Sequence, residues 1–103
     1  TNPVMFVHHV FFWMSPRASE ADRQQLAAGI RSLASIETIK MSHLGIPADT
    51  DRSVIDRSYT FSWLTVFESK EDEAIYQVHP VHLKFIEDCR HLWEKVVVYD
   101  SVD

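Results

Sequence analysis

Two histidines flank a proline in the stretch YQVHPVHLKFI, and a tyrosine lies just upstream of them. The histidines are His79 and His82, and the tyrosine is Tyr76. Histidine is the side chain whose charge changes most readily near neutral pH, so it is well suited to moving protons. The stretch could therefore be a catalytic site, a metal site, or only the start of a helix.

The proline indicates how these residues are positioned. Pro80 suits the first position of a helix, where its missing N–H needs no partner. His79 then takes the N-cap position, where its ring can satisfy a backbone group, and we expect a helix to about Arg90. Spacing of i, i+3, i+4 and i+7 places one set of residues on a single helix face. This set is His82, Phe85, Ile86 and Cys89. His82 is therefore expected to point inward, toward a sheet.

Two alternatives to catalysis are open for this stretch. In the structural alternative, His82 is a buried histidine bonded to a backbone carbonyl and Tyr76 is an ordinary core aromatic. Short motifs of this kind often match by chance. In the metal alternative, His9 would serve as a third ligand. Zinc sites need three or four ligands, and the sequence has no cysteine pair or HExxH motif, so we expect no metal.

Strand geometry limits which of the other histidines can face the same space as His82. His8 and His9 are adjacent, so they face opposite sides of a strand and only one can look into the same space as His82. We expect His9 to line the site. His43 and His91 are expected to be structural or solvated.

Composition narrows the classes of protein to which the chain can belong. Its 103 residues suit one domain, residues 1–103, and 46% of them are hydrophobic, which is enough for a core. The net charge is -5, and no dense Lys/Arg block is present, which argues against a nucleic-acid or anionic membrane surface. The single cysteine, Cys89, cannot form a disulfide within the chain. The apolar run VMFVHHVFFWM is too short to span a bilayer, and we expect a soluble, cytoplasmic protein.

Hydrophobic patterning predicts seven elements. Strands are expected over residues 4–14, 38–46, 59–67 and 92–102, and helices over 20–35, from about 70 to 76, and 80–90. Two capping boxes open the first two helices, Ser19 with Asp22 and Ser69 with Asp72. The order β-α-β-β-α-α-β is that of an α+β, ferredoxin-like fold, with helices on one face of a four-stranded antiparallel sheet.

The first strand is apolar on both faces, although helices can cover only one of them. A second subunit's sheet would cover the other face, so we expect a homodimer. In the first helix, Gly29 costs about 1 kcal/mol relative to Ala, which suggests that it marks close packing.

Three segments together resemble a known family. They are HHVFFWMSP near the start, FESKEDEAIYQVHPVHLKFI in the second half, and WEKVVVYDS at the end. In this combination the chain is similar to the stress-responsive A/B barrel domain (Dabb) family of the dimeric α+β barrel superfamily. The resemblance covers nearly the whole chain, and its most specific part runs from Phe67 to His82.

The resemblance implies both an assembly and a chemistry. It implies a homodimer whose two four-stranded sheets form one barrel. One plant branch, similar to the olivetolic-acid-type polyketide cyclases, closes a ring by aldol chemistry without metal or organic cofactor. Its catalytic histidine matches His82, which would act as the base. Its tyrosine matches Tyr76, which would donate a hydrogen bond to the oxyanion. That branch carries a histidine roughly where Phe61 stands here.

The residues and the family resemblance together suggest three functions. The first is an acid–base enzyme acting on a small apolar or aromatic carbonyl compound, with His9, Phe61, Phe85 and Ile86 lining the ligand site. The second is a non-catalytic, stress-associated protein that binds a small molecule or assembles further. The third is a cofactor-free monooxygenase or haem-binding relative. An enclosed cavity of about 300 Å³ or more touching His82 and Tyr76 would favour the first.

Overall fold

The computed structural model describes residues 5–103, so the first residue of the predicted first strand, Val4, lies outside it. The strands are β1 (Phe6–Trp13), β2 (Met41–Gly45), β3 (Phe61–Phe67) and β4 (Lys95–Val102). The helices are α1 (Glu20–Ser32), α2 (Lys70–Val78) and α3 (Pro80–Cys89), with short 3-10 turns at Leu33–Ser35 and Arg90–Leu92.

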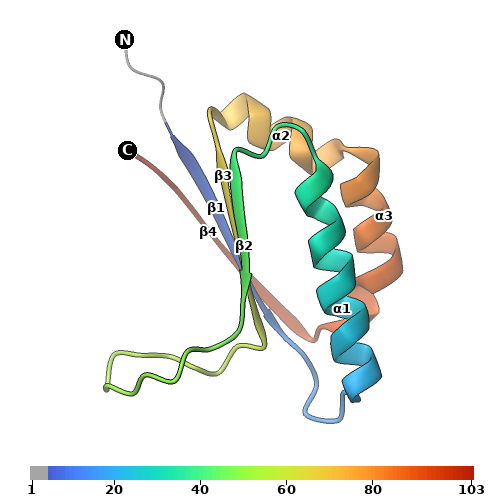
Figure 1. Ribbon diagram of the computed structural model, residues 1–103, viewed down its shortest axis with the longest axis vertical. Coiled ribbons are helices and arrows are strands. Elements are labelled where there is room, and N and C mark those ends of the chain that lie inside the picture. The colour runs from blue at the N-terminus through green and yellow to red at the C-terminus, as the bar shows by residue number, and fades with distance from the viewer. Residues whose placement is uncertain (1–4) are drawn as a thin grey trace.

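The strands form one antiparallel sheet in the order β2-β3-β1-β4. The three helices lie on one side of it, as Figure 1 shows. This arrangement confirms the α+β, ferredoxin-like prediction. All four strands begin later than predicted. For β2 and β4 the reason is that the chain is still turning before them. Ile39 N–H bonds back to the Ile36 carbonyl ahead of β2, and the turn at Arg90–Leu92 precedes β4.

Local capping sets where the helices begin. At α1 both bonds of the predicted capping box form, because Asp22 N–H donates to Ser19 Oγ and Ser19 N–H donates to the Asp22 carboxylate. At α2 only Asp72 N–H donates to Ser69 Oγ. His79 caps α3, and its Nδ1 accepts from Val81 N–H at 3.1 Å. The predicted N-cap role of His79 is therefore confirmed.

The core lies between the sheet and the helices. On β1, Phe6, His8, Val10 and Phe12 are buried on the helix-facing side, while the alternate residues are half-buried. The helices contribute Leu26, Ile30, Tyr76, Phe85 and Cys89. Close packing at Gly29 is confirmed, because a Cβ there would lie 2.6 Å from Cys89 Sγ. This glycine allows α1 and α3 to pack closely, and the two helices lie side by side in Figure 1.

Among residues 5–103, no helix covers the opposite side of the sheet, which we call the outer face (Figure 1). Its β1 residues are Val7, His9, Phe11 and Trp13, and their cross-strand neighbours include Leu64 and Tyr99. The segment 46–60 extends away from the sheet on the side opposite the helices (Figure 1). Within residues 5–103, no helix combines the length and the apolar character needed to cross a membrane.

Candidate functional site

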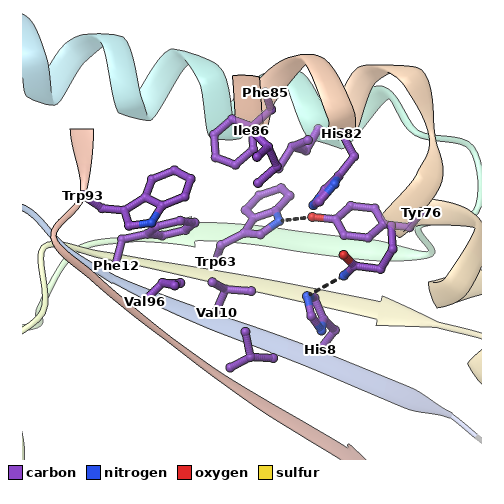
Figure 2. A pocket seen from close by; sticks show the side chains of 13 residues that line it. His8, Val10, Phe12, Trp63, Tyr76, His82, Phe85, Ile86, Trp93 and Val96 are labelled. Carbon is purple, nitrogen blue, oxygen red and sulfur yellow. Dashed lines mark hydrogen bonds between the residues drawn. The ribbon is translucent and has the colours of Figure 1, made fainter. Parts of the chain in front are cut away.

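A cavity of about 180 Å³ lies between the sheet and helices α2 and α3. Its polar lining comes from His8, Tyr76, Gln77 and His82, and its apolar lining includes Trp63, Phe85 and Ile86. Figure 2 shows His82 and Tyr76 approaching from the helix side and His8 from the sheet below them. The cavity touches both His82 and Tyr76, but it is smaller than the about 300 Å³ that would favour the enzyme on size alone. It suits a small ligand.

His82 lies in the first turn of α3 and faces the cavity, as the helical spacing predicted. Its ring centroid is 4.8 Å from that of Tyr76. Burial lowers the pKa of His82, the charge of His8 adds to this effect, and the backbone of Gln77 partly opposes it. His82 Nδ1 is buried and has no hydrogen-bond partner within residues 5–103. A backbone hydrogen bond with Gln77 nevertheless opposes the lowering of the His82 pKa, and this bond is of the kind that the structural alternative requires.

Tyr76 is a fully enclosed hydrogen-bond donor. Its side chain is 1% exposed, and its Oη accepts a hydrogen bond from Trp63 Nε1 at 3.1 Å. Burial raises the pKa of Tyr76 to about 12, against the effect of the Trp63 bond and with a contribution from Glu73. The hydroxyl is therefore neutral at ordinary pH. Because Trp63 can only donate, this bond does not use the Tyr76 proton.

His8, and not His9, is the first-strand histidine of this cavity. His8 Nδ1 lies 2.6 Å from Asp100 Oδ1 on β4. A carboxylate only accepts, so Nδ1 is the donor in this bond. His8 Nδ1 is also 3.7 Å from Glu73 Oε2. These contacts hold the imidazole at the cavity wall.

The expectation for His9 was wrong. His9 lies on the outer face, where its Nε2 is 2.7 Å from Ser62 Oγ. Burial, followed by the charges of His43 and His8, lowers the pKa of His9. The alternation of β1 showed that His8 and His9 face opposite ways. It could not show which of them faces the helices, because both faces of the strand are apolar.

Of the other predicted ligand-binding residues, two line the cavity and one does not. Phe85 and Ile86 line the cavity. Phe61 does not line the cavity. It is the first residue of β3 and is buried, and the Arg23 guanidinium lies 5.6 Å from its ring centroid. Gln77 also lines the cavity, although no motif pointed to it. The second helix was predicted to end at about Tyr76, whereas α2 continues to Val78 and so includes Gln77.

The metal alternative has no geometric support in the described part of the chain. No three His, Cys, Asp or Glu side chains of residues 5–103 meet in a way that could hold a metal ion. His79 turns away from the cavity, and its Nε2 lies 3.2 Å from Glu37 Oε2. The charge of His79 helps to lower the pKa of Glu37, after the larger effect of the Glu37 backbone.

Solved structures similar to this one include one enzyme. A hydroxynitrile lyase from Passiflora edulis is 25% identical, with a TM-score of 0.80 over 98% of this chain and 94% of the other. A dimeric ferredoxin-like protein of unknown function from Thermobifida fusca is 17% identical, with a TM-score of 0.78 over 97% and 92% of the two chains. A Dabb family protein from Mesorhizobium loti is 22% identical, with a TM-score of 0.78 over 97% of each chain.

Sequence comparison gives the family directly. No curated protein matches the chain significantly. The family model described as Stress Responsive A/B Barrel Domain matches residues 6–103, which is nearly all of the sequence. The chain therefore belongs to the stress responsive A/B barrel domain (Dabb) family.

Proposed function

We propose that this protein performs cofactor-free acid–base catalysis on a small apolar or aromatic carbonyl compound. The observation that carries the proposal is the pairing of His82 and Tyr76 at one cavity, with 4.8 Å between their ring centroids. The imidazole is held neutral by burial, and the hydroxyl keeps its proton. A neutral base beside a neutral donor is the combination that proton transfer at a carbonyl carbon requires.

The size of the cavity favours a particular reaction within this class. A space of about 180 Å³ is small for a linear polyketide, so ring closure of such a chain is the less favoured reaction. A similar structure belongs to a hydroxynitrile lyase. We therefore favour reversible cleavage of a carbon–carbon bond next to a hydroxyl, as in a cyanohydrin.

In the proposed cleavage of a cyanohydrin, His82 acts as the base and Tyr76 as the hydrogen-bond donor. His82 takes the hydroxyl proton through Nε2, the ring nitrogen that is not among the buried atoms, and the oxygen's electrons form the carbonyl. The bond to the nitrile carbon breaks, and its electron pair leaves as cyanide. Cyanide then takes the proton from His82 and departs as hydrogen cyanide. Tyr76 Oη–H donates to the substrate oxygen while that oxygen carries negative charge, where such a bond stabilises the transition state.

Release of benzaldehyde from mandelonitrile tests this proposal. The assay compares the wild type with His82→Gln and with His91→Gln, a matched control at an exposed histidine just beyond α3. Loss of a general base typically costs about 100- to 10,000-fold in rate, and we expect that loss for His82→Gln alone. Equal rates for both variants would contradict the role of His82. Binding of benzaldehyde without cleavage of mandelonitrile would favour the alternative of a non-catalytic protein that binds a small molecule.

We also propose that two copies pair through their outer faces. The apolar residues Val7, Phe11 and Trp13 there lack a helix cover, and Tyr99 is 65% exposed. The segment 46–60 extends on this side of the sheet, where it could contact a second copy (Figure 1). The similar protein from Thermobifida fusca is described as dimeric.

A further inference from the structure

The cavity contains a polar residue that the proposed mechanism does not use. Gln77 follows Tyr76 on α2 and lines the same cavity. We propose that Gln77, oriented by Glu73, is a specificity-determining residue that offers its amide oxygen to a ligand hydroxyl, so that the cavity selects alcohols over matching ketones and hydrocarbons. This inference rests on the proposed function, because it assigns the ligand to the same cavity.

The orientation of the Gln77 amide is fixed by Glu73. Gln77 Nε2 donates a hydrogen bond of 2.7 Å to Glu73 Oε2, one helical turn earlier. The Glu73 side chain is 13% exposed, so this bond is well shielded from water. A carboxylate accepts hydrogen bonds and does not donate them. The nitrogen of the amide must therefore face Glu73.

His8 lies on the same side of the amide as Glu73. Gln77 Nε2 is 3.4 Å from His8 Nε2, at the long end of a hydrogen bond. The Glu73 carboxylate requires the amide nitrogen on this side, so the amide oxygen is turned away from both neighbours.

The amide oxygen is left available to a ligand. Gln77 Oε1 forms no hydrogen bond within residues 5–103, and it is not one of the buried polar atoms without a partner there. It is therefore an accessible acceptor on a residue that lines the cavity. Tyr76 supplies a donor to the same space, since its Oη already accepts from Trp63.

A hydroxyl group matches this pair of protein groups best. It can accept from Tyr76 and donate to Gln77 with the same oxygen. During turnover the hydroxyl exchanges this donation to Gln77 for one to His82, which then takes the proton. A ketone can only accept, and a hydrocarbon can do neither. One net hydrogen bond between neutral groups corresponds to about tenfold in affinity. The substrate class favoured by the site is therefore a small secondary alcohol, which includes a cyanohydrin.

Three probes with one carbon skeleton test the inference: 1-phenylethanol, acetophenone and ethylbenzene. Dissociation constants are measured by NMR titration of the labelled protein. For the wild type we expect the alcohol to bind tightest and the hydrocarbon weakest, with steps of about tenfold. Gln77→Leu should remove the gap between alcohol and ketone and keep the gap between ketone and hydrocarbon. Glu73→Gln should also reduce the alcohol preference, which provides a second variant if Gln77→Leu does not fold.

The chain offers a matched control in Gln24. Gln24 Nε2 donates to Glu20 at 2.9 Å with the same i, i+4 spacing, on an exposed part of α1. Gln24→Leu should leave all three affinities unchanged. An alcohol preference that survives in Gln77→Leu would overturn the inference while leaving the proposed function intact. A wild type that binds none of the three probes would overturn both.

Discussion

The indole N–H of Trp63 donates to Tyr76 Oη at 3.1 Å inside the core. Trp63 is 2% exposed and Tyr76 is 1% exposed, so neither group can exchange this bond for water. The bond positions the tyrosine ring beside His82 and occupies the acceptor side of the hydroxyl. A residue of β3 thereby prepares a residue of α2 to donate to a ligand.

Tyr76→Phe should therefore lower stability as well as activity. The variant keeps the ring but leaves Trp63 Nε1–H buried without an acceptor. A lost partner of this kind costs about 1–3 kcal/mol. Urea denaturation measures the change, and Ser35→Ala, which removes an exposed hydroxyl away from the outer face, is the control, for which we expect little change. Equal stabilities of the two variants would mean that the buried bond contributes nothing.

The pH dependence of stability should report on His82. Burial lowers the pKa of His82 from its ordinary 6.5, so below pH 6.5 the unfolded chain binds more protons than the folded chain. The contribution of the neutral imidazole is complete above pH 6.5 and is lost as the pH falls further. His9 acts with the same sign.

We expect the free energy of unfolding of His82→Gln to fall less steeply between pH 7 and about pH 5 than that of the wild type. Urea denaturation across this range measures the slope. His91→Gln, at an exposed site, should keep the wild-type slope. An unchanged slope in His82→Gln would show that the His82 imidazole titrates alike in the folded and unfolded chains.

Local patterns in the sequence predicted the helix half of the site. The spacing of His82, Phe85 and Ile86 gave the inward face of α3, and Pro80 with His79 gave its first turn. These signals are local because a helix repeats within a few residues. The sheet half depends on long-range pairing. Choosing His8 over His9 required knowing which face of β1 the helices cover.

Contacts between distant residues could not be predicted either. Asp100 reaches His8 only because β4 pairs with β1, 92 positions away in the sequence. The bond between Trp63 and Tyr76 likewise depends on how α2 lies over β3. The size of the cavity follows from packing throughout the core, which no motif encodes.

Gly29→Ala should destabilise the packing of α1 on α3. The new Cβ would lie 2.6 Å from Cys89 Sγ and 3.1 Å from the Phe85 ring. Overpacking of this kind costs about 1–3 kcal/mol, which the better helix propensity of alanine offsets only in part. Thermal and urea melts of Gly29→Ala, Cys89→Ala and the double variant measure the coupling. We expect the double variant to lose less than the sum of the two single losses, and strict additivity would exclude the contact as the cause.

A dimer formed by the outer faces should dissociate when a charge is placed there. Phe11→Asp would bury an unpaired carboxylate between the sheets, and such burial is costly. Light scattering over a dilution series should give a dimer for the wild type and a monomer for Phe11→Asp. Val78→Asp at an exposed position on α2 should remain dimeric. A wild type that is monomeric at micromolar concentration would contradict the proposed assembly.

The most direct test of the central claim is a double-mutant cycle on turnover. It compares kcat/KM for mandelonitrile cleavage in the wild type, His82→Gln, Tyr76→Phe and the variant carrying both changes. If both residues act on one substrate in one cavity, their effects are not independent. We predict that each single change greatly reduces kcat/KM and that the double change costs much less than the product of the two. Multiplicative losses, or a wild type that releases no benzaldehyde above the uncatalysed rate, would contradict the account.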